Sequence, residues 1–230
     1  MRTAVLCFHG ASESWTHSSS IAPQEIVRHA RAIRRFRPVH ATFDDAYRSI
    51  EDVAHELLRL GIPVTVFVVT VFADRGGAPL QVDGLIDEDP RELATLDWNG
   101  LRALVAAGAN VGSHTATHRH LVRLSDDELA TELSLSRERV EAEIGGTCRV
   151  LAYPYGEHDG RVRTAARTAG YERAYTLRGP GGDEYAYPRV ELTRKDGVVR
   201  ASLKGTPLYN VLGELVGRFG RTTPPRRAMD

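Results

Sequence analysis

Short apolar runs alternate with longer amphipathic segments along most of the chain. The apolar runs are rich in Val, Ile, Phe, Tyr and Ala, and each is followed by a turn or a polar cluster, a pattern typical of β-strands. Seven strands are therefore predicted, at residues 3–8, 39–43, 63–69, 109–112, 148–152, 172–176 and 187–192.

The segments between these strands carry the start and stop signals of helices. Ser125 opens a capping box with Glu128, and the amphipathic run that follows ends at a pair of glycines. Asp97 and Ser49 stand at the cap positions of two other segments, and a glycine follows each of those as well. The predicted helices cover residues 23–36, 50–60, 98–107, 125–144, 159–169 and 207–218.

Strands that alternate with helices of this length are expected to be parallel, with right-handed crossovers. Seven such units close into a barrel more readily than they form an open sheet, although the pattern is compatible with both. The chain of 230 residues is long enough for one well-filled core. The pattern therefore predicts an α/β barrel in a single domain.

Composition and charge exclude several kinds of partner. The 30 Lys and Arg residues balance the 30 Asp and Glu residues, so no net charge favours nucleic acid or an anionic membrane. The longest apolar stretch, at 62–73, falls short of the roughly 20 residues that a membrane helix needs. Met1 leads directly into a strand-like run, without the core of an export signal. Cys7 and Cys148 lie in apolar runs where free thiols pack as small hydrophobic groups. We expect a cytoplasmic protein with no nucleic-acid partner and no membrane span, and the oligomeric state stays open.

Titratable side chains gather just after the predicted strands. In a parallel barrel, the loops at the C-terminal ends of the strands form the functional site. Four of the predicted strands are followed there by His9, by Asp44 and Asp45, by His114, and by Tyr155 within Tyr-Pro-Tyr-Gly. We expect these groups to converge on one site.

Two adjacent carboxylates at the end of an apolar run need an explanation, because like charges repel and both are costly to desolvate. His114 and His118 stand at i and i+4, a spacing that on one helical turn aims two imidazoles at one point. Two imidazoles and one carboxylate form a set suited to zinc or a related divalent ion. One aspartate of the pair at 44–45 then serves as a ligand, and the other as a base.

Each feature also has a simpler interpretation. Two aspartates after a strand commonly form a turn or a helix cap. A lone His-x-x-x-His pair can lie on a polar helix face. His9 is compatible with a structural hydrogen-bonding role, and His17, His29, His40 and His55 are expected on solvated faces.

Two stretches together, Thr-Phe-Asp-Asp at 42–45 and Ser-His-Thr-Ala-Thr-His at 113–118, resemble the first two motifs of the polysaccharide deacetylase family, the NodB homology domain of carbohydrate esterase family 4. Leu-Ala-Tyr-Pro-Tyr-Gly at 151–156 resembles the third motif. The resemblance implies a distorted (β/α)7 TIM-like barrel over roughly residues 1–195. A C-terminal helical extension at 196–220 and a flexible tail at 221–230 are expected to follow.

The resemblance also implies hydrolysis of an N-acetyl group from an amino sugar with one divalent metal ion. Zn²⁺ is expected first, with Co²⁺, Ni²⁺ or Mn²⁺ as alternatives. Asp45, His114 and His118 match the metal ligands, and Asp44 matches the catalytic base. Tyr155 matches the residue whose backbone N–H helps to hold the oxyanion. The expected partner is an N-acetylated sugar: a glycan precursor, a nucleotide- or lipid-linked sugar, or a metabolite intermediate.

The sequence departs from the family pattern at three places. Ala46 stands where the family usually has Gly, so its φ is either below zero or strained. Ala152 stands where many members have the Arg that orients the base, and Arg189 is our candidate for that task, with a surface position as its alternative. No histidine follows residue 158 to supply the usual general acid, so we assign that role to His9, with His158 second.

Two further functions stay compatible with the sequence. The same site can hydrolyse another linear or cyclic C–N amide, since fold and metal fix the reaction type but not the substrate. A non-catalytic sugar-binding relative is the other alternative. The presence of all three ligands together with the base favours an enzyme.

Overall fold

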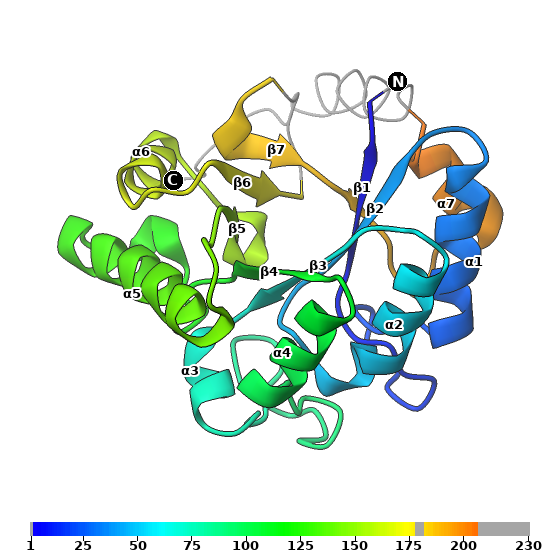
Figure 1. Ribbon diagram of the computed structural model, residues 1–230, viewed down its shortest axis with the longest axis horizontal. Helices are drawn as coiled ribbons and strands as arrows, with labels where there is room; N and C mark the ends of the chain where they lie inside the picture. Colours follow the sequence, from blue (N-terminus) through cyan, green and yellow to red (C-terminus); the bar gives the residue numbers. More distant parts are fainter. Residues whose placement is uncertain (1, 178–181, 207–230) are drawn as a thin grey trace, which may run out of the picture.

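The computed structural model describes residues 2–177 and 182–206. A parallel sheet curls into a nearly closed barrel, and helices surround it (Figure 1). The hydrogen-bonded order of the strands is β7-β6-β5-β4-β3-β2-β1-β8. The strands are β1 (Ala4–Phe8), β2 (Val39–Phe43), β3 (Val64–Val68), β4 (Asn110–Ser113), β5 (Val150–Ala152), β6 (Arg173–Thr176), β7 (Tyr187–Pro188) and β8 (Val190–Glu191). The barrel predicted from the alternating pattern is thus confirmed.

The barrel closes through one short stretch of chain. β7 pairs with β6 on one side, and β8 pairs with β1 on the other. Only Arg189 separates β7 from β8, so the single strand predicted at 187–192 is split into two. The reason is the stagger at the seam, where successive residues pair with different neighbours. Arg189 therefore lies where the two ends of the sheet meet.

Helices cover the outside of the barrel, and most of their predicted ends are confirmed. The Ser125 and Glu128 side chains form both bonds of the capping box, and Gly145 ends that helix in the left-handed region with φ 76°. Asp97 caps α4 by accepting the Gly100 N–H. The helices are α1 (Pro23–Arg34), α2 (Glu51–Arg59), α3 (Thr70–Asp74), α4 (Trp98–Ala106), α5 (Asp126–Ile144), α6 (Gly160–Thr168) and α7 (Val198–Lys204). Short 3-10 helices are η1 (Arg48–Ile50), η2 (Leu121–Arg123), η3 (Pro154–Gly156) and η4 (Glu184–Ala186).

Two helix predictions differ from the structure or lie outside it, and one helix was not predicted. Ser49 does not cap α2, because η1 precedes that helix and the Ser49 hydroxyl accepts the Ala11 N–H instead. Helix α3 was not predicted, since its residues continue the apolar run of β3. Helix α7 lies within the predicted extension at 196–220, whereas the helix predicted at 207–218 and the tail at 221–230 fall outside the described residues.

Apolar side chains fill two spaces, one between sheet and helices and one inside the barrel. On β1, Leu6 and Phe8 belong to the large outer core, whereas Val5 belongs to a small interior cluster with Phe67, Ala152 and Tyr175. This division follows from the alternation of side chains along a strand. The two cysteines are buried and unpaired, as expected.

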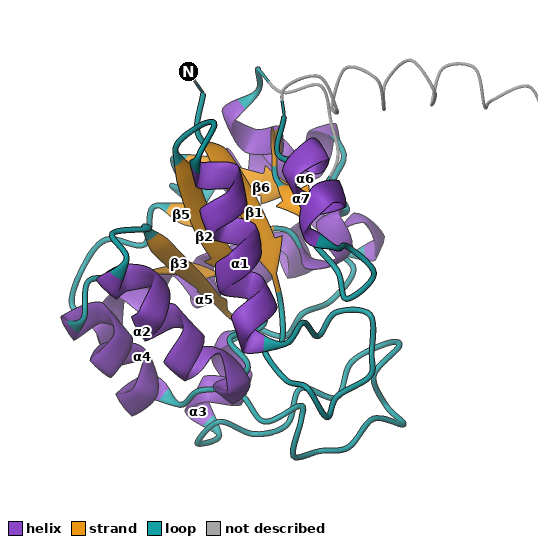
Figure 2. Cartoon of the chain, turned by 90° about the vertical axis from the view of Figure 1, so that its right-hand side faces the viewer, coloured by secondary structure: helices purple, strands orange, loops and turns teal. Residues whose placement is uncertain are grey.

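The C-terminal ends of the strands open on one end of the barrel. Figure 2 shows the long connecting loops at that end, away from the N-terminus. They include residues 9–22 between β1 and α1, and residues 75–97 between α3 and α4. Among the described residues, no helix combines the length and the apolar character needed to cross a membrane.

Candidate active site

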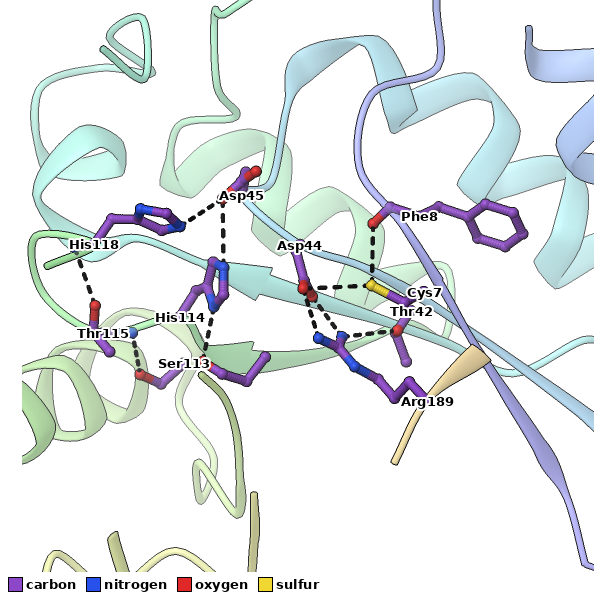
Figure 3. Close-up of polar contacts among 11 residues, drawn as sticks. Cys7, Phe8, Thr42, Asp44, Asp45, Ser113, His114, Thr115, His118 and Arg189 are labelled. Atoms are coloured by element: carbon purple, nitrogen blue, oxygen red, sulfur yellow. Dashed lines mark hydrogen bonds and ion pairs between the residues drawn. The ribbon is translucent and has the colours of Figure 1, made fainter. Parts of the chain in front are cut away.

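The two aspartates that follow β2 point to different partners. The Asp44 N–H still donates to the Phe8 carbonyl at 2.9 Å, which continues the β1–β2 pairing. Asp45 and Ala46 then adopt left-handed backbone conformations, with φ values of 68° and 54°. This reversal separates the neighbouring carboxylates, so Asp45 faces two imidazoles and Asp44 faces a guanidinium (Figure 3). Ala46 thus takes the strained alternative, at a cost of about 1–2 kcal/mol.

Asp45, His114 and His118 form a compact set of candidate metal ligands. Asp45 Oδ1 lies 3.4 Å from His114 Nε2 and 3.4 Å from His118 Nε2, and all three side chains are buried. Asp45 Oδ1 has no hydrogen-bond partner among the described residues. Ligands about 2.1 Å from a four-coordinate zinc ion stand roughly 3.4 Å apart. The donor atoms therefore fit a divalent cation.

Both imidazoles present Nε2 to Asp45. His114 Nδ1 lies 2.8 Å from the Ala152 carbonyl, which can only accept, so Nδ1 carries a proton and Nε2 is the nitrogen available to a cation. Burial lowers the pKa of His118 to about 4, although the charge of Asp45 opposes this shift. His118 is consequently neutral at physiological pH.

The histidine pair does not lie on a helical turn, contrary to the prediction from its spacing. Residues 114–118 form a loop after β4, in which Thr115 and His118 have φ values of 71° and 62°. The two rings come together all the same, with centroids 4.9 Å apart. Loop geometry, rather than helical periodicity, brings the two Nε2 atoms to one point.

Arg189 holds the Asp44 carboxylate from the opposite side. Its Nη1 and Nη2 atoms donate to Oδ1 and Oδ2, each at 2.6 Å. Both side chains are almost fully buried. Burial by itself raises the pKa of Asp44, but the charge and hydrogen bonds of Arg189, together with His114, hold it well below its usual range. Asp44 is therefore an ionised acceptor, and the surface alternative for Arg189 is excluded.

The barrel interior supports this ion pair. The Arg189 guanidinium lies 5.4 Å from the ring centre of Phe67 and 5.7 Å from that of Tyr175. Cys7 Sγ, at 3.5 Å from Asp44 Oδ2, is a further neighbour of the carboxylate. Ala152 belongs to the interior cluster that also contains Phe67 and Tyr175.

A cavity of about 210 Å³ lies over these groups. His9 lines it, as expected, and its ring lies near Asp44 and Cys7. His158 does not line it, because its Nδ1 faces Arg163 and its ring lies beside Tyr153. The lining residues are His9, His17, Ser19, Asp44, Asp45, Tyr47, Val82, Asp83, Gly84, Leu85, His114, His118, Tyr155, Gly156 and Leu177.

Tyr155 borders this cavity in a left-handed conformation, with φ 58°. Its ring lies between those of His118 and His120, with centroid distances of 4.7 and 3.9 Å. The N–H groups of the next two residues donate within η3, whereas the Tyr155 N–H has no acceptor among the described residues. A free backbone donor thus stands at the edge of the cavity.

Several histidines differ from their expected surface positions. His29 is a buried residue of α1, His17 lines the cavity, and His40 bonds to Thr65 Oγ1. The residue that sequence reasoning missed altogether is Glu132, a buried carboxylate that bonds to the histidine loop. A signal was present, because Glu132 occupies a core-facing position of α5 next to Leu133.

A comparison with protein families agrees with the architecture of this site. The family model described as "Polysaccharide deacetylase" matches residues 32–174, which span both aspartates, both histidines and the third motif. This chain belongs to the polysaccharide deacetylase family. The family comprises enzymes that deacetylate polysaccharides, and membership confirms the resemblance inferred from the motifs.

Solved structures of similar fold include further deacetylases. The Streptococcus pyogenes deacetylase PplD in complex with acetate is 15% identical, with a TM-score of 0.75, over 90% of this chain and 99% of that one. IcaB from Ammonifex degensii is 22% identical, with a TM-score of 0.70, over 88% and 96%. BC0361, a polysaccharide deacetylase from Bacillus cereus, is 19% identical, with a TM-score of 0.70, over 90% and 69%. These likenesses establish the deacetylase fold for the whole barrel.

Proposed function

We propose that this chain is a metal-dependent hydrolase that removes an N-acetyl group from an amino sugar. The observation that supports the proposal is that two adjacent carboxylates have different partners. Asp45 faces two imidazoles, while Asp44 is held ionised by Arg189 within the same cavity. A ligand set beside an oriented base is the minimum that metal-assisted amide hydrolysis requires.

Asp45, His114 and His118 would hold the ion, with Zn²⁺ as the first candidate and Co²⁺, Ni²⁺ or Mn²⁺ as alternatives. When bound, such an ion polarises the amide carbonyl and lowers the pKa of water in its coordination sphere. The burial of all three ligands keeps bulk water away from them.

Asp44 is the base in this proposal. Oδ2 already has Arg189 and Cys7 as neighbours, whereas Oδ1 accepts from Arg189 alone among the described residues. Oδ1 therefore has more capacity left to accept the proton of the attacking water. Arg189 acts through Asp44 as a positioning residue. It fixes both oxygens and keeps the carboxylate charged at neutral pH.

Tyr155 and His9 complete the set. The unoccupied backbone N–H of Tyr155 would donate to the oxyanion that forms as water adds to the carbonyl carbon. His9, on the cavity wall near Asp44, would donate a proton to the departing nitrogen as the C–N bond breaks. Acetate and a free amine are then the products.

The substrate class within this proposal is an N-acetylated sugar that occurs as a glycan precursor, a nucleotide- or lipid-linked sugar, or a metabolite intermediate. A cytoplasmic location is part of the proposal, and the two buried unpaired thiols, Cys7 and Cys148, are compatible with it.

The experiment is an acetate-release assay of the purified chain loaded with each candidate metal. The panel contains N-acetylated sugars in free, nucleotide-linked and lipid-linked form, together with simple linear and cyclic amides. We expect equal amounts of acetate and free amine from at least one sugar, and loss of both after chelation. Release from the simple amides alone would assign another substrate class. Sugar binding without any acetate would support a non-catalytic relative.

A further inference from the structure

Side-chain oxygens accept most of the backbone N–H groups in the loop that carries both histidines. Four successive N–H groups, at residues 115–118, each donate to a side chain rather than to a backbone carbonyl. The hydroxyl of Ser113, the last residue of β4, accepts the first of these bonds at 3.0 Å, and the hydroxyl of Thr115 accepts the last at 3.1 Å. The middle two, from Ala116 and Thr117, both go to Oε2 of Glu132, each at 3.0 Å. A single carboxylate from α5 therefore grips the centre of the loop.

Glu132 is poorly placed for any other task. Its side chain is buried, and among the described residues no Arg, Lys or His forms an ion pair with it. Its second oxygen, Oε1, accepts the hydroxyl of Thr117. Burial of a carboxylate without a cationic partner is unfavourable unless hydrogen bonds offset the loss of hydration. Within the part of the chain that the structure describes, the hydrogen bonds to the Glu132 carboxylate come from the histidine loop.

The loop needs such a constraint because its conformation is intrinsically disfavoured. Thr115 and His118 both have positive φ, and the β-branched Thr115 is especially unfavourable there. Without the Glu132 carboxylate, the N–H groups of Ala116 and Thr117 would lose their acceptor, and the loop could relax toward negative φ. His118 Nε2 would then leave its position 3.4 Å from Asp45 Oδ1.

We propose that Glu132 is a positioning residue, which holds the loop so that His114 and His118 are arranged for the cation before it binds. The inference rests on the proposed metal site, but it concerns metal affinity and not turnover. It assigns the effect to the reach of the Glu132 side chain and its hydrogen bonds, rather than to its charge.

Two substitutions distinguish the effect of the length of the Glu132 side chain from the effect of its charge. In Glu132→Gln, the carbonyl oxygen can still accept both backbone N–H groups, and the amide can donate to Thr117 Oγ1. In Glu132→Asp, the charge stays but the side chain is one methylene shorter. We expect the Gln variant to bind Zn²⁺ within about threefold of the parent, and the Asp variant to bind it roughly 10- to 100-fold more weakly. The measurement is the Zn²⁺ dissociation constant, by competition with a chromophoric chelator.

Glu141 offers a matched control on the same helix. Its carboxylate also accepts a backbone N–H, that of Cys148 at 3.1 Å, but it does not contact the histidine loop. Glu141→Asp should leave Zn²⁺ affinity unchanged, even where the melting temperature of the metal-free protein falls as much as in Glu132→Asp. Equal loss of Zn²⁺ affinity in both variants would show that Glu132 contributes only to the general stability of the fold.

Other outcomes decide the remaining alternatives. Parent-like affinity in Glu132→Asp overturns the proposal, and weakening in Glu132→Gln alone makes charge the cause. Equal weakening in the Gln and Asp variants contradicts the assignment of the effect to reach alone. If Glu132→Asp does not fold, Thr117→Val serves instead, because it removes one of the three hydrogen bonds between the loop and Glu132. This variant should bind Zn²⁺ measurably more weakly, and unchanged affinity would contradict the proposed role of Glu132. Acetate release is assayed separately, so that metal binding without turnover counts against the proposed function and not against this inference.

Discussion

The guanidinium of Arg189 meets the carboxylate of Asp44 edge to edge, with both N–O distances at 2.6 Å. The two residues are 145 positions apart in the chain, and the closure of the barrel brings them together. Because β7 and β8 flank Arg189 at the seam, its side chain enters the barrel interior beside β1 and reaches the end of β2. In the proposed mechanism, Arg189 would take the place of the arginine that the family resemblance implies at the position of Ala152.

Replacement of Asp44 by Asn should separate catalysis from metal binding. The Asn variant keeps the shape of the side chain but loses a proton acceptor, while the three candidate ligands are unchanged. We expect full metal content and a kcat lower by roughly 10²–10⁴-fold. Metal content is measured by atomic spectroscopy and kcat by acetate release. Asp45→Asn is the comparison, and it should lose metal as well; near-parent kcat in Asp44→Asn would refute the role of base.

Replacement of Arg189 by Met should move the acidic limb of the pH–rate profile to higher pH. Arg189 lowers the pKa of Asp44, so its loss leaves burial to raise that pKa, and more of the base is protonated at a given pH. The rate should also fall, because nothing then fixes the carboxylate. A profile with the acidic limb unchanged would contradict the assignment.

The same variant tests the ion pair through stability. The depressed pKa of folded Asp44 means that its contribution is present above the unfolded value of about 3.9 and is lost as the pH falls below it. We expect Arg189→Met to lower the free energy of unfolding by about 3–5 kcal/mol at pH 7, because a buried charge is left unpaired, and by less on acidification. Arg149→Met, which breaks an exposed pair with Glu172, should change it by at most about 1 kcal/mol.

Replacement of His9 by Gln should flatten the alkaline limb of the pH–rate profile. In the proposed mechanism His9 gives a proton to the leaving nitrogen, and Gln cannot do so at any pH. His158→Gln is the matched control, because His158 faces Arg163 outside the cavity, and its profile should keep both limbs. His17 also lines the cavity. An unchanged alkaline limb in His9→Gln, with a flattened one in His17→Gln, would transfer the role to His17.

Replacement of Gly112 by Ala should destabilise the barrel interior. A Cβ atom there would stand 2.6 Å from the Phe67 ring and 2.8 Å from Val150, and Phe67 packs against Arg189. We expect the free energy of unfolding to fall by about 1–3 kcal/mol, as overpacking does elsewhere. Gly146→Ala, where no atom lies within 4 Å of the new Cβ, should be close to neutral in the same denaturant titration.

Local signals in the sequence were enough for most of the fold. The capping box at Ser125 and the cap at Asp97 depend on residues within one helical turn, so both can be predicted from the local sequence. Strand periodicity likewise located β1 to β6 within a few residues. The helix cap predicted at Ser49 was wrong because the N–H of Ala11, distant in sequence, donates to the Ser49 hydroxyl. Helix α3 was missed because its apolar residues continue the pattern of β3.

The candidate site was predicted from strand ends and motif spacing, since parallel strands deliver the residues that follow them to one end of a barrel. That argument predicted from the sequence alone that one site contains Asp44, Asp45, His114 and His118. The sequence alone did not decide how the backbone turns there. The left-handed conformations after Asp44 and within the histidine loop depend on bonds from other elements, of which the bonds from Glu132 on α5 are an example. The grip of Arg189 on Asp44 likewise depends on the closure of the sheet. Periodicity and caps are short-range properties that a chain displays in its order of residues, whereas the pairing of buried charges and the strained loops that carry ligands exist only once distant segments supply their hydrogen bonds.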